Sequence, residues 1–329
     1  MALDGRILAH AKVTLAEKRK LNENRQEQRL LSAYAKNPQI RELDAELRLT
    51  MAELVGAALF SNSNASANDI RKKNEQLQIA RKSELVRVGF SEDYLDEKYM
   101  CEKCNDTGFA DNHICECLEE IYKKEQKASL SNLFKLGDER FENFIISYYD
   151  ETPNADTGIS PRNNMEIVYK TCFEYARKFG KNSMNLLFIG APGLGKTYIS
   201  ACIARVVAES GFSVVYDMAA VIFSKFEDVK FSKADDLEEK REEIKRYLEC
   251  ELLIIDDLGT ELITAFTIAA LYEVVNTRLI TGKKTIVSSN LTVEELRNKY
   301  SEQIASRLEW EYQVLRFYGD DIRMKKALL

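Results

Sequence analysis

The sequence contains no long apolar run, since none of its hydrophobic stretches approaches the 18 residues that a membrane-spanning helix needs. Its first residues, Met1 to Arg6, lack a basic segment followed by an apolar one, so we expect no signal peptide. Only 4 of the 329 residues are proline, while 45% are hydrophobic and 30% are charged, as in an ordinary globular protein. These features predict a cytoplasmic protein with no membrane partner.

A strong excess of positive charge is also missing. The net charge is −6, which argues against a protein that coats nucleic acid in general. The first 100 residues carry 17 Lys/Arg against 15 Asp/Glu, so the acidic excess lies in the remainder. Any contact with DNA is therefore expected to be local, in a groove that is basic on an otherwise acidic protein.

Seven cysteines in a cytosolic chain are not expected to form a disulfide framework. Cys172, Cys202 and Cys250 lie among apolar neighbours, and we interpret them as small buried side chains. The other four fall within 17 residues: Cys101, Cys104, Cys115 and Cys117. Two closely spaced thiolate pairs suit tetrahedral Zn²⁺, and four protein ligands leave no open position. We therefore predict structural zinc, with His113 as an alternative ligand to Cys115.

The first hundred residues are predicted to be helical, because apolar residues recur there at steps of three and four. A first helix ends at Asn37-Pro38, a second extends to about Ala58, and a third covers about 68–88 after a polar turn at 61–66. Antiparallel packing of these helices is favoured. An extended coiled coil is disfavoured, because no heptad pattern persists.

Four regions follow from this pattern. Residues 1–98 form a helical N-terminal region, and residues 99–130 form the cysteine knob with a short helix at about 118–130. Residues 131–164 are interpreted as a linker, because 150–164 is polar and rich in Pro and Gly and is expected to be an exposed loop. Residues 165–329 form the last domain.

In the last domain, helices and strands alternate. Its strands are apolar and β-branched without polar alternation, as expected for parallel strands that are covered on both faces. We expect strands at 185–189, 213–216, 252–255, 285–288 and 313–317, and helices at 166–179, 196–208, 265–280 and 293–300. This alternation predicts a parallel α/β sheet flanked by helices.

A glycine-rich motif follows the first strand of that domain. It matches G-x-x-x-x-G-K-[ST] and consists of Gly190, Ala191, Pro192, Gly193, Leu194, Gly195, Lys196 and Thr197. In such a motif, backbone N–H groups of the turn and of the helix N-terminus converge on phosphates. The lysine contacts the outer phosphates and the hydroxyl ligates Mg²⁺. We therefore predict ATP and Mg²⁺ as cofactors.

Two carboxylates end the apolar strand 252–255. Asp256 is expected beside Thr197, where it would orient the magnesium shell. Asp257 is expected to align or deprotonate the attacking water. The alternative is a solvated turn after a strand, which the glycine motif upstream disfavours.

Four further residues are candidates because of their positions. Asn290 follows a predicted strand and is expected to contact the attacking water or the γ-phosphate. Arg307, just before the last strand, is expected to reach the ATP of a neighbouring subunit as an arginine finger. Arg323 is a candidate for a phosphate contact in cis, and Arg278 for an interface or DNA contact.

Taken together, these motifs resemble those of the DnaC/DnaI-type replicative helicase loaders, in the zinc-containing variety of Gram-positive bacteria and their phages. Five stretches carry the resemblance: Tyr99–Gly108, Phe141–Phe144, the glycine motif, Ile254–Glu261 and Phe317–Arg323. The glycine and carboxylate motifs are common to loaders, initiators and transposition helpers. The cysteine knob and the helical N-terminal region point to the loaders.

This resemblance implies an AAA+ P-loop ATPase domain preceded by an all-helical region with a small zinc knob. It implies that the N-terminal region grips the replicative hexameric DNA helicase. It also implies that the AAA+ domain self-assembles, binds and hydrolyses ATP at subunit interfaces, and engages single-stranded DNA. Loaders of this type lack the helical lid of most AAA+ proteins, and only six residues follow Arg323 here.

Two other functions compete with the loader. An IstB-like transposition helper ATPase would bind a transposase and duplex DNA through the same motifs. An ATP-gated adaptor that does not hydrolyse ATP would differ by its lack of turnover. Single-stranded DNA usually needs aromatic side chains beside a basic groove. We find no such cluster, so the DNA-contact residues stay unassigned.

Overall fold

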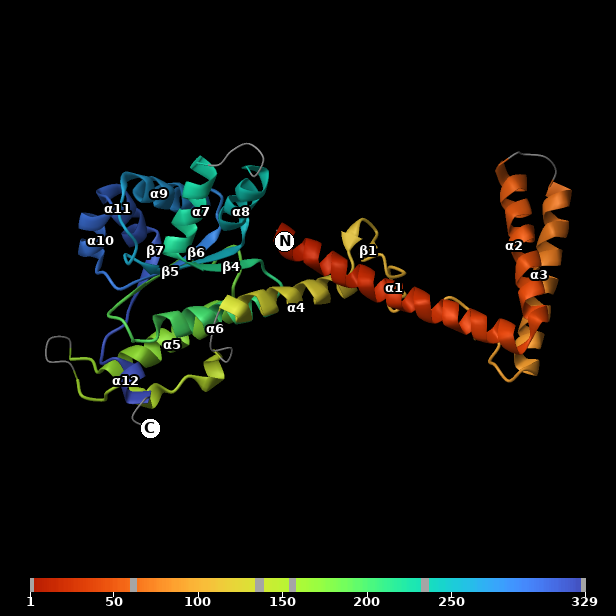
Figure 1. Ribbon diagram of the computed structural model, residues 1–329. Helices are drawn as coiled ribbons and strands as arrows, with labels where there is room; N and C mark the ends of the chain where they lie inside the picture. The colour runs from red at the N-terminus through yellow and green to blue at the C-terminus, as the bar shows by residue number, and fades with distance from the viewer. Residues whose placement is uncertain (1–2, 60–63, 134–138, 154–157, 232–236, 327–329) are drawn as a thin grey trace. The chain divides into compact units, whose positions relative to one another are not determined.

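The chain forms two units in the computed structural model, which describes residues 3–59, 64–133, 139–153, 158–231 and 237–326 (Figure 1). One unit is Lys12–Leu118, and the other combines Met1–Ala11 with Glu119–Leu329. Within the described residues, no helix is long and apolar enough to cross a membrane.

The unit Lys12–Leu118 is built mainly from long helices, as the apolar spacing predicted. They are α1 (Gly5–Lys36), α2 (Pro38–Leu59) and α3 (Asn64–Arg87). The break at Asn37-Pro38 is confirmed, because Pro38 opens α2, where its missing N–H is not needed. Of the predicted polar turn 61–66, residues 61–63 lie outside the described residues, and residues 64–66 already belong to α3.

The two helices α2 and α3 pack antiparallel through a polar seam. Arg81 pairs with the buried Asp44 at 3.1 Å, and Asn74 donates to Thr50 Oγ1 at 2.7 Å. The partner numbers run in opposite directions along the two helices, which fixes the antiparallel pairing. Buried polar groups of this kind require such partners, so the seam selects one register.

The second unit contains a five-stranded parallel sheet. Its strands are β3 (Asn185–Ile189), β4 (Val214–Met218), β5 (Leu252–Leu258), β6 (Lys284–Ser289) and β7 (Tyr312–Arg316). They lie in the order β4-β5-β6-β3-β7, and every neighbouring pair is parallel. This order, with the glycine motif after β3, which lies between β6 and β7, is that of an AAA+ P-loop domain and confirms the predicted fold class.

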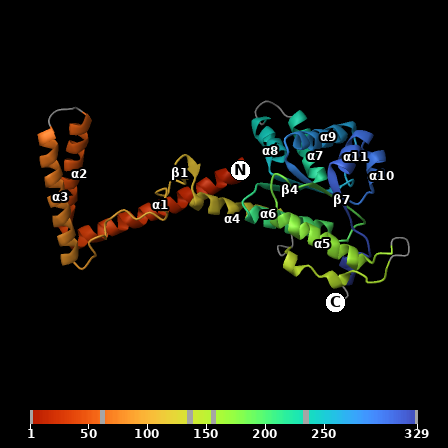
Figure 2. The same cartoon turned by 180° about the vertical axis from the view of Figure 1, so that it is seen from behind.

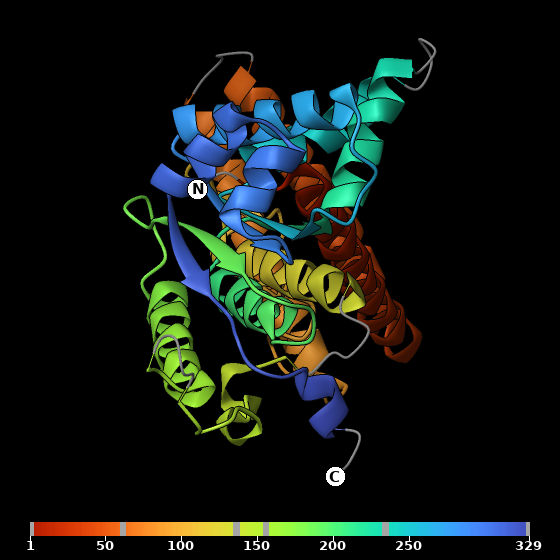
Figure 3. The same ribbon diagram turned by 90° about the vertical axis from the view of Figure 1, so that its left-hand side faces the viewer.

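Helices cover both faces of this sheet (Figures 1 and 2). One face is packed by α5 (Pro161–Arg177) and α6 (Lys196–Glu209). The other is packed by α7 (Ala219–Phe231), α8 (Leu237–Glu249), α9 (Ala265–Ile280), α10 (Val293–Lys299) and α11 (Glu302–Trp310). Successive residues of β3 alternate between the two cores: Leu186 and Phe188 face α5 and α6, whereas Leu187 and Ile189 face the other helices. Figure 3 shows the same layers from the side.

The remaining elements of this unit are short, apart from α4. They are α4 (Glu116–Leu133), the 3-10 turns η1 (Phe141–Asn143) and η2 (Ile146–Tyr148), and α12 (Ile322–Lys326). Residues 141–149, which we expected to lie in a linker, pack against the sheet domain. Phe141 and Tyr149 are buried in the core formed with α5 and α6.

Two sequence-based expectations were wrong in this unit. The loop expected to extend to residue 164 ends earlier, because Ser160 caps α5 by accepting from the Asn163 amide, and Pro161 takes the first helical position. Residues 154–157 of that loop lie outside the described residues. Arg278, a candidate for an interface or DNA contact, is fully buried and donates to the carbonyls of Tyr247, Cys250 and Lys284. Its role is to satisfy carbonyl groups where α8, α9 and β6 meet.

Candidate functional site

The loop between β3 and α6 is held in its conformation by glycines. Gly190, Gly193 and Gly195 all have positive φ, and Gly195 is the residue from which α6 starts. A Cβ at Gly193 would lie 2.0 Å from a carboxylate oxygen of Asp321, and one at Gly195 would lie 2.7 Å from the hydroxyl of Tyr149. Side chains at these positions would therefore both strain the backbone and collide with the groups that cover the loop.

Lys196 is folded into this loop and is only 4% exposed. Its ammonium group donates to the carbonyls of Gly190 at 2.6 Å and Ala191 at 2.9 Å, and to Oδ1 of Asn290 at 2.7 Å. Burial lowers the pKa of Lys196, while the carboxylates of Asp257 and Asp256 act in the opposite direction. An additional anionic partner would therefore stabilise the buried, charged ammonium group of Lys196.

Asp256 ends the regular part of β5 and is buried. Its Oδ2 accepts from Thr197 Oγ1 at 2.9 Å and from the Tyr216 hydroxyl, and its Oδ1 accepts from the Ser288 hydroxyl. Donors from α6, β4 and β6 thus converge on one carboxylate. Such a group has a fixed orientation and presents a hard oxygen ligand beside the Thr197 hydroxyl.

Asp257 lies in a bulge of the sheet. The register between β5 and β6 shifts between Ile255 and Leu258, and Asp257 has a φ of 54°, an unusual value for a residue that is not glycine. The Ser288 hydroxyl accepts from the Asp257 amide at 3.1 Å. This bulge turns Asp257 away from the regular alternation of the strand, as expected where a side chain has to be re-aimed.

The electrostatic environment of Asp257 is mixed. Burial and the neighbouring Asp256 raise the pKa of Asp257, while Lys196, Arg323 and a hydrogen bond from Asn290 oppose the increase. The Asn290 amide therefore contacts this carboxylate, and the charges of Lys196 and Arg323 act on it from two other parts of the fold. Arg323 also acts electrostatically on Lys196, which shows that both lie near the same site.

The segment after β7 passes over the glycine loop. The Ile322 amide donates to the Gly193 carbonyl at 3.1 Å, and the Arg323 amide donates to Asp321 Oδ1 at 2.9 Å. On the same side of the domain, the Tyr149 hydroxyl donates to the Leu194 carbonyl at 2.9 Å. The loop is therefore fastened from outside by two chain segments that are distant in sequence.

Arg307 lies on α11, where it is half-buried. Its guanidinium group donates to Asn276 Oδ1 at 3.3 Å and to the Tyr272 hydroxyl at 3.1 Å, and it lies 4.7 Å from the centre of the Tyr272 ring. Side chains of α9 thus hold it in place. Thr292 caps α10 together with Glu295, so Asn290 is not needed as a helix cap.

The four clustered cysteines lie together in the unit Lys12–Leu118. Their sulfur atoms are all within 4.8 Å of one another, with Cys101 to Cys115 at 3.7 Å and Cys104 to Cys117 at 3.5 Å. A zinc tetrahedron with Zn–S bonds of about 2.3 Å places its sulfurs roughly 3.8 Å apart. His113 is exposed on β2 (His113–Ile114), outside this group of four. The donor set and its spacing therefore fit one metal ion.

A tight backbone around Asp106 shapes this cluster. Asn105 and Asp106 have positive φ, and the Asp106 carboxylate accepts from the amides of Met100 and Cys101 at 3.1 and 2.8 Å. The Gly108 amide donates to the sulfur of Cys104 at 3.3 Å. β2 pairs antiparallel with β1 (Phe109–Ala110), which brings the second pair of cysteines back to the first.

Sequence reasoning missed several residues of the nucleotide-site geometry. Tyr216 and Ser288 contact Asp256, and Tyr149 and Asp321 cover the glycine loop. Two of these were detectable in principle. Tyr216 and Ser288 are polar residues inside apolar strands, at the ends of β4 and β6 that neighbour the carboxyl end of β5.

Comparison with known proteins agrees with this geometry. Residues 174–328 match the family of IstB-like ATP binding proteins. The replicative helicase loader DnaC of Buchnera aphidicola (subspecies Baizongia pistaciae) is 26% identical over 153 residues, which cover 46% of this chain and 61% of that protein. DnaC of Escherichia coli K12 is 24% identical over 135 residues, covering 41% of this chain and 54% of that protein. The chain resembles the DnaC/DnaI-type AAA+ loaders.

The extent of these matches is limited. The chain spans little more than half the length of the curated relatives, and the family match covers only the sheet domain. The crystal structure of the DnaC helicase loader is 18% identical, with a TM-score of 0.43, covering 54% of this chain and 98% of that chain. The fold class rests on the strand order given above.

Proposed function

We propose that the protein is an ATP-dependent loader of the replicative DNA helicase onto single-stranded DNA, with ATP bound and hydrolysed at interfaces between subunits. One observation carries the ATPase part. Where the glycine loop meets the carboxyl ends of β5 and β6, Lys196 contacts Asn290 and Thr197 contacts Asp256. The resemblance to DnaC proteins supports the loader part.

The residues would divide the chemistry among them. The loop amides and Lys196 would hold the phosphates, and Thr197 with Asp256 would hold Mg²⁺, which neutralises phosphate charge when bound. Asp257 would orient the attacking water or accept its proton, and Asn290 would contact that water or the γ-phosphate. Besides burial, the charge of Arg323 lowers the pKa of Lys196, so Arg323 is suited to contact the phosphates in cis.

Arg307 would act on the ATP of a neighbouring subunit. Its contacts with Tyr272 and Asn276 of α9 would orient the half-buried guanidinium for a phosphate from outside the chain. A cation of this kind stabilises the charge that develops during phosphoryl transfer. Self-assembly of the chain through its AAA+ domain follows from this proposal.

We further propose that the four cysteines hold one structural zinc ion and that residues 1–98 contact the helicase. Zinc would fix the turn around Asp106 and the β1–β2 hairpin to each other, because ligation and folding of such a small unit are linked. The division into residues 1–98, 99–130, 131–164 and 165–329 remains our working division of the chain.

The test is a pull-down and loading assay with the replicative helicase of the same host. The full chain should retain the helicase, and transfer of the helicase to a single-stranded DNA circle should require ATP. A Lys196→Ala variant should still bind the helicase but lose the ATP-dependent step. If the wild-type protein neither binds the helicase nor transfers it to the DNA circle, the proposal is wrong.

An IstB-like transposition helper is the second candidate, favoured by the family match over residues 174–328. Such a protein would use the same ATP site with duplex DNA and a transposase as partners. Comparing ATPase stimulation by single-stranded and duplex DNA separates the two. Stimulation by duplex DNA alone, without helicase binding, would favour the transposition helper.

A further inference from the structure

Residues 257–261, which we call the carboxylate turn, are held by a dense set of hydrogen bonds. The Asp257 carbonyl accepts from both the amide and the hydroxyl of Thr260, at 3.3 and 2.9 Å. The next carbonyl accepts from the Ser289 hydroxyl at 2.6 Å, and the one after it accepts from the ammonium group of Lys299. The backbone of this turn is therefore fixed by side chains from β6 and α10 as well as by its own residues.

One side chain of the turn, Glu261, uses both of its carboxylate oxygens. Oε2 accepts from the Gly259 amide at 2.9 Å, and Oε1 accepts from the Tyr300 hydroxyl. Gly259 has a φ of 106°, a conformation that residues with side chains rarely adopt, and a Cβ there would lie 2.6 Å from Leu291. Glu261 thus ties a bend that requires glycine to a tyrosine at the end of α10.

Tyr300 is a firm anchor for this carboxylate. It is 4% exposed and follows the last residue of α10, the helix that starts three residues after Asn290. Burial raises the pKa of Tyr300, and its hydrogen bond with Glu261 raises it further, so the hydroxyl keeps its proton and donates it to the carboxylate. Glu261 therefore connects the turn after Asp257 to the helix after Asn290.

The conformation of Asp257 needs such support. Its φ of 54° is unfavourable for a residue that is not glycine, and such values persist only where the surrounding structure enforces them. Without the Glu261 carboxylate, the Gly259 amide would lose its partner and the turn could relax. A displacement of about 1 Å is enough to slow a reaction strongly when it moves a group that acts on the attacking water.

We infer that Glu261 is a positioning residue for Asp257, holding the carboxylate turn in the conformation from which Asp257 acts on the attacking water. This inference rests on the proposed function, because it assumes that Asp257 aligns or deprotonates that water. It adds a residue that acts through the backbone of the turn rather than on the water itself.

The first test separates ATP binding from hydrolysis in the full-length protein. Glu261→Ala should leave the affinity for ATP unchanged, while the single-turnover hydrolysis rate falls roughly tenfold to a hundredfold, as expected when a reacting group is misplaced. Glu261→Gln should keep most of the rate, because its amide can still accept from Gly259 and donate to the Tyr300 oxygen. Equal losses in these two variants would show that the hydrogen bonds of Glu261 are not what matters.

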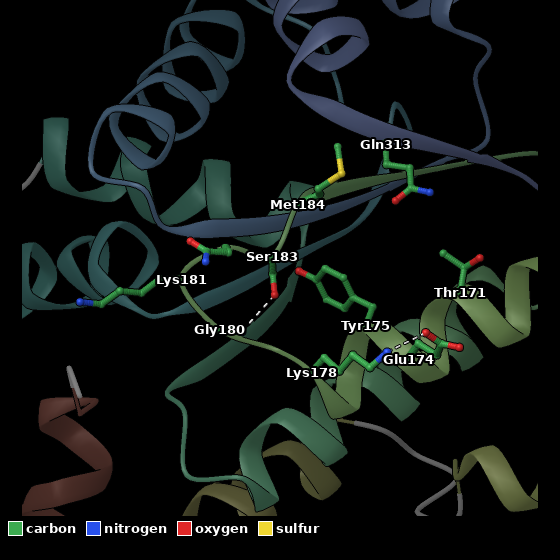
Figure 4. A pocket seen from close by; sticks show the side chains of 10 residues that line it. Thr171, Glu174, Tyr175, Lys178, Gly180, Lys181, Ser183, Met184 and Gln313 are labelled. Atoms are coloured by element: carbon green, nitrogen blue, oxygen red, sulfur yellow. Dashed lines mark hydrogen bonds and ion pairs between the residues drawn. The ribbon is translucent and has the colours of Figure 1, made fainter.

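Matched variants control for the loss of each group. Tyr300→Phe removes only the anchoring hydroxyl and should lower the rate in the same direction, whereas Tyr247→Phe removes a hydroxyl that donates to Asp217 at 2.8 Å, outside the turn. Glu174→Ala removes a glutamate that pairs with Lys178 at 3.0 Å (Figure 4). That pair borders a concavity at the starts of β3 and β7, away from the glycine loop, so both controls should hydrolyse ATP like wild type.

A double-mutant cycle decides whether Glu261 acts through Asp257. In Asp257→Asn protein, adding Glu261→Ala should reduce the remaining rate much less than it does in wild type, because residues that act through one another have non-additive effects. The same fold loss in both backgrounds would overturn the inference. If Glu261→Ala does not fold, the cycle is run with Tyr300→Phe, which keeps the buried ring. Wild-type protein that binds ATP but never hydrolyses it would instead overturn the proposed function.

Discussion

At the scale of single residues, Asp256 and Asp257 are adjacent in sequence but occupy different environments. Asp256 receives three hydroxyl donors and is buried, whereas Asp257 lies in a bulge with positive φ and faces Lys196 and Arg323. The first environment suits a fixed ligand for a cation. The second suits a group that exchanges a proton, because its pKa is raised above that of an ordinary aspartate.

The raised pKa of Asp257 leads to a prediction about pH. Only the ionised carboxylate can accept a proton from water, so hydrolysis should decrease as the pH falls through the pKa of Asp257. Since burial and Asp256 raise that pKa from 3.8, the decrease should begin at a higher pH than for an ordinary aspartate. Single-turnover rates at saturating ATP across the acid range measure it.

Two variants sharpen this test. Asp257→Asn should keep nucleotide binding and lose hydrolysis by about a hundredfold or more, the usual contribution of a general base. Asp217→Asn is the control, because burial also raises the pKa of Asp217, although its carboxylate contacts Tyr247 outside the site. If Asp217→Asn removes the decrease in the hydrolysis rate at low pH, Asp257 is not the group whose protonation causes that decrease.

The sequence predicted which residues come together at this site, such as Thr197 with Asp256, better than it predicted the residues that support them. The glycine motif and the carboxylates are recognisable because phosphate and Mg²⁺ chemistry demands those residue types at fixed spacing. Tyr149 and Asp321 were missed because their contacts with the glycine loop join segments more than 40 residues and more than 120 residues apart. Arg278 was misjudged because nothing local to an arginine reveals that buried carbonyls surround it.

At the scale of structural elements, the cysteine cluster should behave as a unit. Anaerobically purified protein should contain one zinc ion per chain. Cys104→Ser should lose that metal and unfold β1, β2 and the turn at Asp106 locally, because metal ligation and folding of such a small unit are linked. Metal analysis and hydrogen exchange over residues 99–117 measure both effects, with nucleotide binding unchanged.

A matched variant controls for loss of a thiol alone. Cys172 is buried in the core next to α6, outside the cluster, so Cys172→Ser should retain the metal. Zinc well below one ion per chain in wild-type protein would count against a structural site. Loss of ATP binding in Cys104→Ser would contradict the separation of the cluster from the sheet domain.

The first turn of α1 is fastened to α8 by a buried ion pair. Asp4 caps α1 by accepting from the Arg6 and Ile7 amides, and its second oxygen lies 2.6 Å from Nε of Arg246. The Asp4 side chain is 1% exposed. Removing one partner of such a pair leaves a buried charge, so Arg246→Gln should lower the free energy of unfolding by about 2–3 kcal/mol.

The same variant should increase hydrogen exchange in residues 5–11, because their anchor is lost. Arg6→Gln is the control, since the Arg6 side chain is 72% exposed and contacts Glu243 at 3.5 Å, and an exposed pair contributes about 1 kcal/mol or less. Equal destabilisation by both variants would show that the contact of Asp4 with Arg246 has no special weight. No sequence pattern predicted this contact, which joins positions 242 residues apart.

At the scale of the whole molecule, regular elements were predictable where the pattern was strong. The alternation of apolar strands with helices determined the parallel sheet, because strands covered on both faces need nearly continuous apolar residues. The helices α7 and α8 were not predicted, since α8 is dominated by charged residues and resembles a solvated segment. The packing of residues 141–149 onto the domain also depends on contacts that no local pattern shows.

The proposed assembly gives the last prediction, which concerns Arg307. Its guanidinium is held by Tyr272 and Asn276, so Arg307→Ala removes a positioned charge without exposing a core residue. Because an arginine finger acts mainly on the transition state, ATP binding should persist while stimulated hydrolysis falls roughly a thousandfold.

A mixture of Arg307→Ala with Lys196→Ala protein decides between action in cis and in trans. In trans, one kind of mixed interface combines the intact glycine loop of one variant with the intact arginine of the other, so mixing should restore activity that neither variant has alone. Crosslinking verifies that mixed assemblies form, and if they form without any recovered hydrolysis, Arg307 does not act on a neighbouring subunit.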